Sequence, residues 1–428
     1  MRSKRVWAAL LEIEQVVVES VRFEPFVSPD GVVGEGGRSD GVVVVSVRPK
    51  AGWGSRCGRC GRRCPGYDQG RGRRWWRTFD VGLHLAFVEA AAPRVRCPQH
   101  GVVVEALPWA RHDAGHTRGF DEQVAWLATR MAKTAATKLL RIGWATIGAI
   151  IDRVIADADA QAGDRLDGLT RIGVDEISYR RGYKYLTVVV DHTTRRVLWL
   201  AEGRSKTTLQ RFFALLGPQR AAQIELVSAD GADWIFNAVR DSCPNAEICL
   251  DPFHVVRWAG DALDEIRRDV WNTARKAGHT TEANQLKASR WALWKNPGNL
   301  TANQQAKLAQ IQRTNKPLYR AYLLKEQLRE VFATVGQAGI ALLDRWLYWA
   351  ARSRLPQFVD LARKIKTYFR RDIVNTLTHR LSNGLIEATN TKIRLLTRMA
   401  YGFRSVNALI ALVKLHLGGY HIALPGRP

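Results

Sequence analysis

The sequence predicts an α/β protein: a sheet of mixed direction with a large helical segment inserted after it, preceded by a β-rich unit and a small helical unit. Three observations predict this class. Apolar residues recur at helical spacing from Phe120 to about residue 160. From Arg171, three strand-like segments are followed by alternating helices and strands. Residues 255–370 then show a helical pattern almost throughout.

The individual elements follow from the same patterns. Before residue 120, β-favouring runs alternate with turn signals over residues 11–50, and strand-like segments follow at 79–96. After Arg171, we expect strands at 172–179, 185–190, 197–202, 224–229 and 247–250, with helices at 207–216 and near 234–240. The last helical stretch begins near residue 384 and contains Glu387. A Gly-rich segment at 31–41 is typical of a surface loop.

The charge balance indicates a polyanionic partner. The 428 residues include 65 Lys and Arg against 40 Asp and Glu, a formal charge of +25. Such an excess fits nucleic acid or an anionic membrane. The membrane is disfavoured because no run of 18 or more apolar residues occurs, and no apolar signal region follows the basic N-terminus. We therefore expect an intracellular, soluble protein.

Four of the six cysteines cluster near the N-terminus in short-spaced pairs. Cys57 and Cys60 are separated by two residues, as are Cys97 and His100. Two such turns can complete a tetrahedral Cys₃His zinc site, and Cys64 is a spare thiol that could replace Cys60. The alternative is two unrelated turns with free thiols. The segment between the pairs carries Arg73, Arg74 and neighbouring tryptophans, which indicates either contact with phosphates or a solvated basic loop.

The helical stretch at 120–160 fits a helix-turn-helix, with Gly143 at a turn. In that interpretation the residues facing DNA would be Lys138, Arg141, Trp144 and Thr146. An ordinary three-helix bundle is the alternative.

Two aspartates occupy strand positions that suit a metal site. Asp175 lies within an apolar strand, where a carboxylate is costly unless it is paired or binds a cation. Asp230 follows another strand, at the kind of edge where α/β sheets gather their ligands. With Glu387 on a helix, they could hold two divalent cations about 4 Å apart. Spacing alone does not select these three, and the rivals are Glu176, Asp191, Asp233 and Asp251.

Several sequence blocks together resemble the bacterial insertion-sequence transposases of the ISL-three type, and the resemblance covers nearly the whole chain. The N-terminal Cys pairs are similar to that family's zinc-binding segment. The other blocks, in order, are Gly173-Val-Asp-Glu-Ile-Ser, Tyr183-Lys-Tyr-Leu-Thr-Val-Val-Val-Asp191, Ser228-Ala-Asp-Gly231, Asp251-Pro-Phe-His254-Val-Val-Arg257, Ser382-Asn-Gly-Leu-Ile-Glu387-Ala-Thr-Asn390-Thr-Lys392 and Tyr401-Gly-Phe403. The second metal pair departs from the family, because many relatives use Cys where His100 stands.

The resemblance implies a ribonuclease H-like core, a catalytic triad of Asp175, Asp230 and Glu387, and Mg²⁺ as cofactor beside a structural Zn²⁺. It implies a DDE transposase that cuts and rejoins double-stranded DNA at terminal inverted repeats, acts as a homodimer on DNA, and lies in the bacterial cytoplasm at the nucleoid. The expected domains are a zinc-binding domain at 1–115, a helix-turn-helix at 116–165, the first part of the core at 166–257, a helical insertion at 258–371, and the final part of the core with basic C-terminal helices at 372–428.

Further residues are candidates for DNA contact. Arg394 and Arg398 lie seven and eleven residues after Glu387, on about the same helix face, and Lys392 lies farther round. A solvated helix face is the alternative. His254 could contact DNA, orient a catalytic group or be purely structural. Two other functions stay open: a catalytically silent DNA-binding regulator, which the presence of all three acids disfavours, and a metal-dependent nuclease without strand transfer.

Overall fold

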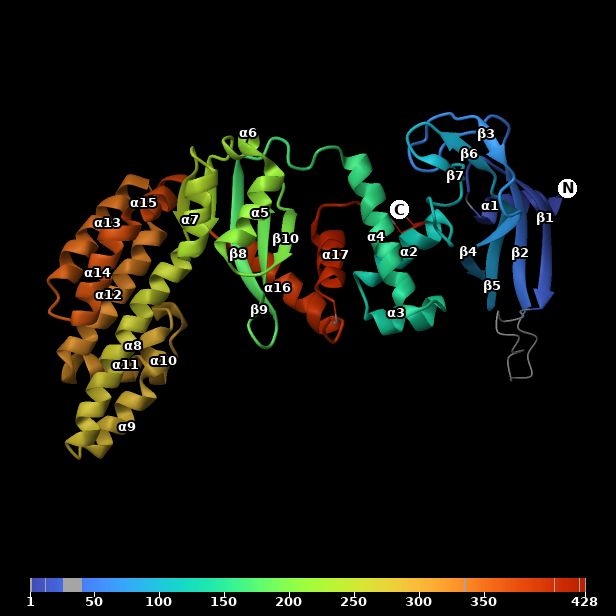
Figure 1. Ribbon diagram of the computed structural model, residues 1–428. Coiled ribbons are helices and arrows are strands. Elements are labelled where there is room, and N and C mark those ends of the chain that lie inside the picture. The colour runs from blue at the N-terminus through green and yellow to red at the C-terminus, as the bar shows by residue number, and fades with distance from the viewer. Residues whose placement is uncertain are drawn as a thin grey trace. The chain divides into compact units, whose positions relative to one another are not determined.

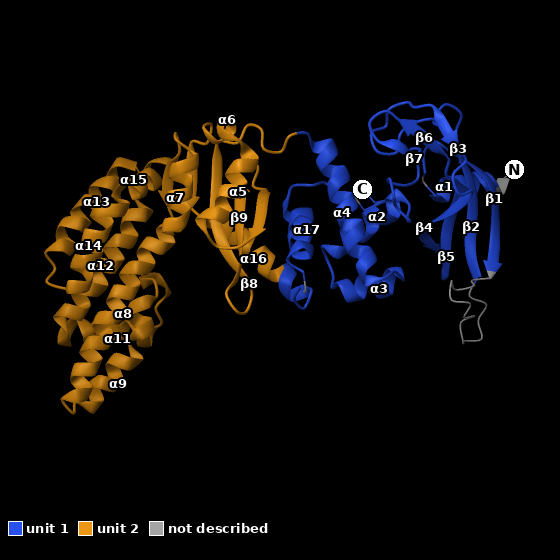
Figure 2. Cartoon of the chain, in the orientation of Figure 1, with its two compact units in different colours: residues 1–163, 396–428 blue, residues 164–395 orange. Residues whose placement is uncertain are grey.

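The fold was analysed in a computed structural model, which describes residues 2–11, 13–25, 41–334, 336–403, 405–422 and 424–427. The expected loop at 31–41 lies outside these ranges except for Gly41. The chain forms two compact units, residues 1–163 with 396–428 and residues 164–395 (Figure 2). These units are coarser than the five expected domains. The C-terminal residues 396–428, expected with the core, belong to unit 1 by this division.

Unit 1 begins with a β-rich part (Figure 1). A short helix, α1 (Arg2–Leu11), which the sequence patterns did not predict, packs against β1. A four-stranded sheet has the order β1-β2-β5-β4, in which β2 and β5 run parallel. Its apolar core contains Val45, Trp76, Val88 and Trp109. The strands are β1 (Val16–Pro25), β2 (Gly41–Pro49), β4 (Arg73–Val81) and β5 (His84–Ala91).

A smaller sheet has the order β3-β6-β7, and Cys97 ends its strand β6. Its strands are β3 (Gly66–Asp68), β6 (Arg94–Cys97) and β7 (Gly101–Val104). Buried Cys57, Cys64 and Cys97 form a small core with Val95 and Val103. The sheet is too short to bury much apolar surface, so a metal that cross-links its turns would contribute directly to folding.

Three helices follow in unit 1: α2 (Arg118–Ala128), α3 (Lys133–Leu140) and α4 (Trp144–Ala162). The Thr117 hydroxyl accepts a hydrogen bond from the backbone N–H of Phe120 and caps α2. Helix α3 ends at Arg141 in the left-handed conformation, with φ 54°, and Gly143 precedes α4. The C-terminal helix α17 (Val406–Leu417) packs against α4. The expected three-helix unit is therefore present, with a fourth helix added from the end of the chain.

Unit 2 contains a five-stranded sheet of order β10-β9-β8-β11-β12. Strand β9 is antiparallel to β8 and β10, while β11 runs parallel to both β8 and β12. This is the ribonuclease H-like topology that the family resemblance implied. The elements are β8 (Arg171–Arg180), β9 (Lys184–Asp191), β10 (Val197–Glu202), α5 (Lys206–Leu216), α6 (Pro218–Ala221), β11 (Leu226–Ala229), α7 (Asp233–Ser242) and β12 (Glu247–Leu250).

The rest of unit 2 is helical, and one apolar core runs from the sheet into these helices, including Ile172, Phe212, Leu263, Trp346 and Phe358. The segment expected as an insertion, residues 258–371, is helical as predicted. The helical elements after β12 are α8 (Pro252–Lys276), α9 (Thr280–Ala288), α10 (Arg290–Trp294), η1 (Pro297–Asn299), α11 (Ala302–Thr314), α12 (Lys316–Ala333), α13 (Gly336–Ala351), α14 (Pro356–Lys364), the π-helical turn η2 (Ile365–Phe369), α15 (Arg370–His379) and α16 (Gly384–Met399). Most of α15 and all of α16 follow residue 371, in the segment expected as the final part of the core.

Candidate active site and metal centres

Asp175 and Asp230 are brought together by the register of two parallel strands. Strand β11 pairs with β8 so that Ser228 lies opposite Gly173. Each aspartate lies two residues beyond its member of this pair, so the two carboxylates occupy neighbouring positions at the carboxyl end of β11. Gly231 then turns the chain away with a φ of +89°, which favours glycine.

The carboxylates of Asp175, Glu176 and Asp230 form one cluster, with an oxygen from each within 4.8 Å of the others. Burial, and then the negative charge of Asp230, raise the pKa of Asp175 to about 7. Burial also raises the pKa of Glu176. A divalent cation would remove this repulsion, and oxygen ligands are those that Mg²⁺ prefers. The donor set therefore fits such an ion.

Glu176, weighed only as a rival in the sequence, belongs to this cluster. The Arg204 guanidinium lies 2.9 Å from Glu176 Oε1. The other carboxylate oxygen, Oε2, is buried without a hydrogen-bond partner among the described residues. Arg204 thus holds one oxygen of Glu176 and leaves the other unpaired.

Glu387 lies in the first turn of α16 and is not part of the three-carboxylate cluster. Its pKa is raised by burial and by the charge of Asp251, and lowered by His254. One turn further along the same helix, the Asn390 Nδ2 donates a hydrogen bond to Asp175 Oδ2 at 2.8 Å. Helix α16 therefore contacts the cluster through Asn390, with Glu387 on the adjoining turn.

His254 and Asp251 connect the parts of this site. Asp251 follows β12 directly, and its Oδ2 lies 3.0 Å from His254 Nδ1. The His254 Nε2 lies 3.9 Å from Asp230 Oδ2. Hydrogen bonding to Asp251 raises the pKa of His254, with Asp230 adding to the effect. Asp251 Oδ1 also accepts a hydrogen bond from the Asn383 backbone N–H, just before α16. His254 thus lies among carboxylates, beside the candidate active site.

The expected zinc ligands also lie together. One ligand atom from each of Cys57, Cys60, Cys97 and His100 is within 4.8 Å of the others. Nearest separations are 3.5 Å from Cys57 Sγ to His100 Nδ1, 3.8 Å between the Cys60 and Cys97 sulfurs, and 3.6 Å from Cys97 Sγ to His100 Nδ1. Zn–S bonds of about 2.3 Å place tetrahedral ligands about 3.8 Å apart, so the four residues fit zinc. Cys64 instead donates to the Arg62 carbonyl.

The expected DNA contacts of unit 1 fall into two groups. Arg141 is paired with Asp80 and also donates to the Leu83 carbonyl, and Arg73 is paired with Glu89 and Glu19. Trp144 is partly exposed, with Lys133 Nζ 4.0 Å from its ring centroid. Within the described part of the chain, the exposed Lys138 and Arg74 form no ion pair, and Thr146 is half-buried. Arg74 and Lys138 are therefore the freer cations.

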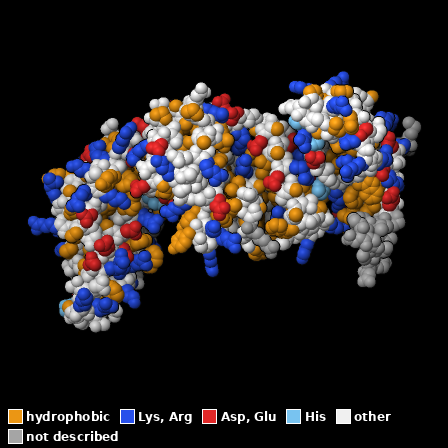
Figure 3. Space-filling model, in the orientation of Figure 1, with side chains coloured by type: hydrophobic (Ala, Val, Ile, Leu, Met, Phe, Trp, Pro, Cys, Tyr) orange, Lys and Arg blue, Asp and Glu red, His pale blue; other side chains and the backbone are white. Residues whose placement is uncertain are grey.

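The expected contacts on α16 are exposed cations. Lys392, Arg394 and Arg398 form no ion pair with any residue that the structure describes. Lys and Arg side chains are spread over the visible face of both units (Figure 3). These three cations are therefore free to contact DNA phosphates, as are other exposed Lys and Arg side chains.

A carboxylate cluster on a ribonuclease H-like sheet, joined in one chain to a zinc-binding unit and a helix-turn-helix, defines an enzyme that acts on DNA. Residues 172–413 match the family model of the DDE transposases of ISL3 type. Residues 105–155 match the helix-turn-helix domain of transposase family ISL3, and residues 53–100 match the zinc-finger of transposase IS204/IS1001/IS1096/IS1165.

Curated relatives agree with this family. The chain is 52% identical over 447 residues to the transposase for insertion sequence element IS1557 of Mycobacterium tuberculosis, across 100% of this chain and 98% of that protein. It is 28% identical to the transposase for insertion sequence element IS1001 of Bordetella parapertussis, across 81% of this chain and 85% of that protein. The chain therefore belongs to the ISL3 family of transposases, the ISL-three type named above. Among the described helices, none is long and apolar enough to span a membrane.

Proposed function

We propose that this transposase cuts DNA at the ends of its own insertion sequence and joins the freed ends to a target, in a reaction that depends on Mg²⁺. The observation that carries the proposal is the cluster of Asp175, Glu176 and Asp230, whose oxygens lie within 4.8 Å of one another. Two bound Mg²⁺ ions would activate water or a 3′-hydroxyl and stabilise the leaving oxygen. Asp175 and Asp230 would hold them, and Glu387 would complete the ligand set from α16.

The protein's own residues would position the scissile phosphate. Phosphoryl transfer needs placement and charge neutralisation more than covalent help from side chains. Asn390 would orient Asp175, and the Asp251–His254 pair would orient Asp230, through the contacts described above. Exposed Lys392, Arg394 and Arg398 would contact phosphates beside the site, and Arg74 and Lys138 would contact DNA from unit 1.

The proposed partner is double-stranded DNA with terminal inverted repeats. Joining two ends requires both to be held at once, which a homodimer on DNA would do. The expected place of action is the bacterial cytoplasm, at the nucleoid. The five expected domain bounds, from 1–115 to 372–428, remain part of this proposal.

The test is Mg²⁺-dependent cleavage of a labelled DNA that carries the sequences flanking the gene. Wild type is compared with Glu387→Gln, and with Glu330→Gln as a matched control, because Glu330 is an exposed glutamate of α12 in the same unit. Wild type and the control are expected to cut at a defined end, and Glu387→Gln to bind without cutting. DNA binding without cutting by all three proteins would instead indicate a DNA-binding regulator. Cutting without any joined product would indicate a nuclease.

A further inference from the structure

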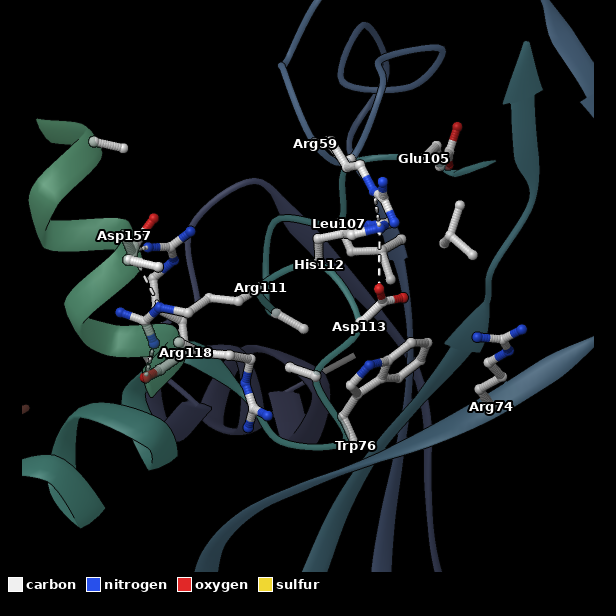
Figure 4. A pocket seen from close by; sticks show the side chains of 18 of the residues that line it. Arg59, Arg74, Trp76, Glu105, Leu107, Arg111, His112, Asp113, Arg118 and Asp157 are labelled. Atoms are coloured by element: carbon white, nitrogen blue, oxygen red, sulfur yellow. Dashed lines mark hydrogen bonds and ion pairs between the residues drawn. The ribbon is translucent and has the colours of Figure 1, made fainter. Parts of the chain in front are cut away.

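Unit 1 contains a cavity of about 450 Å³ whose wall is built from the zinc-binding turn, strand β4, the segment 104–118 and helix α4 (Figure 4). Its volume falls within the range of about 300–1,000 Å³ typical of ligand pockets. Residues lining its inner part include Trp76, Leu107 and Ala110, and Trp76 is only 4% exposed. None of the residues in this wall belongs to the carboxylate cluster, so the cavity is a separate site.

Five arginines line the cavity, and three of them are already neutralised. Arg111 contacts Asp121, Glu122 and Asp157, and Arg118 also contacts Asp157. Arg153 contacts Asp121. Three arginines and three carboxylates thus form one network, which joins α4 to α2 and to the segment before it. This network fixes the shape of the wall and adds little net charge.

The wall also contains two further arginines, Arg59 and Arg74, and two further carboxylates, Glu105 and Asp113. Arg59 comes from the turn between Cys57 and Cys60, and Arg74 comes from β4. Both are exposed, and neither forms an ion pair among the residues that the structure describes. The Arg59 Nε lies 3.1 Å from His112 Nε2, which directs the side chain across the opening. Arg59 and Arg74 both line the cavity and come from different elements (Figure 4).

Gly58 keeps this opening in shape. A Cβ at Gly58 would lie 2.6 Å from the Val104 carbonyl oxygen and 2.8 Å from His112 Nδ1. Both distances are below normal van der Waals contact, so any larger residue would push Arg59 and His112 apart. The position of the Arg59 side chain therefore depends on a close backbone approach at the zinc-binding turn.

We propose that this cavity binds one phosphodiester-bearing nucleotide of the DNA, with Arg59 and Arg74 on its phosphate and the apolar wall around Trp76 against its sugar and base. Guanidinium groups bind phosphate through paired N–H donors, and an apolar wall can contact a sugar and a base of any sequence. The inference rests on the proposed function, because it requires that unit 1 binds DNA. It assigns a specific anchoring point to the junction of the zinc-binding turn and α4.

The test measures binding of full-length protein to its DNA end in a Glu387→Gln background, which keeps the DNA uncut. Arg59→Gln/Arg74→Gln is compared with Arg63→Gln/Arg71→Gln, which removes the same charge from exposed arginines outside the cavity. Each lost phosphate contact lowers the slope of log K against log salt by about 0.9. The cavity variant is expected to lower the slope by about 0.9 more than the control, because both arginines contact one phosphate.

A scan with single methylphosphonates, which remove the charge of one phosphate at a time, locates the contact. A methylphosphonate at one position is expected to weaken wild-type binding and to have no effect on binding by the cavity variant. Ala156→Leu, which fills the cavity from an exposed position of α4 without changing charge, should weaken DNA binding and remove the effect of a methylphosphonate at the same position. Zinc content and thermal melting show that each variant is folded.

Three other results would overturn the cavity assignment or both proposals. Equal slopes for the cavity variant and the control, in a wild type that binds and cuts its ends, would overturn the cavity assignment and leave the transposase function standing. Saturable binding of dAMP or inorganic phosphate that requires Arg59 and Arg74, without any change in DNA binding, would assign the cavity to a free nucleotide or phosphate instead. A wild type that does not bind its own ends would overturn both proposals.

Discussion

Asn390 donates a hydrogen bond from its Nδ2 to Asp175 Oδ2 at 2.8 Å, across 215 residues of sequence. Asn390 is buried on α16, one turn after Glu387, whereas Asp175 lies in the central region of β8. This contact links the helix that carries Glu387 to the strand that carries Asp175. The other oxygen of Asp175, Oδ1, accepts a hydrogen bond from the Glu176 backbone N–H at 2.8 Å.

Asn390→Ala is expected to lower the cleavage rate about 10–100-fold, the usual effect of removing a residue that orients a metal ligand. It should also raise the Mg²⁺ concentration needed for half-maximal cutting, while DNA affinity stays unchanged. Thr391→Ala, an exposed neighbour on the same helix, serves as the control. A slower rate with an unchanged Mg²⁺ requirement would show that Asn390 has a purely structural role.

The zinc site predicts a difference between two nearby cysteines. Cys57→Ser should lose bound zinc and lower the melting temperature of unit 1, since Cys57 is one of the four clustered ligands. Cys64→Ser should keep the metal, because the Cys64 thiol donates to the Arg62 carbonyl and a hydroxyl can do the same. Zinc content measured by mass spectrometry decides between them. Loss of zinc in Cys64→Ser as well as in Cys57→Ser would show that Cys64 is a ligand.

His116 predicts how the stability of unit 1 depends on pH. Burial, and then Arg153 and Arg77, lower its pKa to about 4, against about 6.5 in an unfolded chain. The folded state therefore holds His116 neutral. Above pH 6.5, His116 is neutral in both the folded and the unfolded state and does not reduce the free energy of unfolding. As the pH falls from 6.5 towards 4, the unfolded state binds a proton that the folded state does not, so the free energy of unfolding decreases. The largest possible effect is about 3 kcal/mol.

His116→Phe keeps an aromatic ring beside Phe120, whose ring centroid lies 5.5 Å away, but has no proton to gain. Relative to wild type, this variant should become progressively more stable between pH 6.5 and 4.5. Urea unfolding at both values measures the difference. If the difference in unfolding free energy between wild type and variant is the same at both pH values, His116 does not titrate in this range.

Lys325 predicts a stability effect in the helical insertion. Its ammonium group is buried, donates to the Leu293 and Trp294 carbonyls at the end of α10, and contacts Glu326. Lys325→Met would leave these acceptors unpaired and the Glu326 charge less compensated, at a cost of roughly 2–4 kcal/mol. Lys316→Met, at an exposed position of α12, should cost far less. Similar unfolding free energies for both variants would contradict this role.

The sequence predicted most of the fold because its periodicities are local. Strands β8 to β12 and the helical insertion follow from alternation and helical spacing over a few residues. The meeting of Asp175 and Asp230 was also predictable, because the ends of neighbouring strands share one edge of a sheet. The Cys₃His grouping follows from the two paired spacings.

Other features depend on contacts between distant residues and left no periodic signal. The pairing of Arg141 with Asp80 joins positions 61 residues apart, and the role of Asn390 depends on the packing of α16 against β8. Glu176 follows Asp175 directly, and strand alternation alone would place it on the opposite face. Its membership of the carboxylate cluster became visible only in three dimensions.

The central claim is that Asp175, Asp230 and Glu387 hold the catalytic cations, and counting Mn²⁺ bound to the DNA complex by electron paramagnetic resonance tests it most directly. Wild type and Asp233→Asn, a nearby aspartate outside the cluster, are predicted to bind two ions tightly. Asp175→Asn, Asp230→Asn and Glu387→Gln should each lose at least one ion and all cutting, while DNA binding is retained. Unchanged Mn²⁺ binding in these three variants would contradict the account.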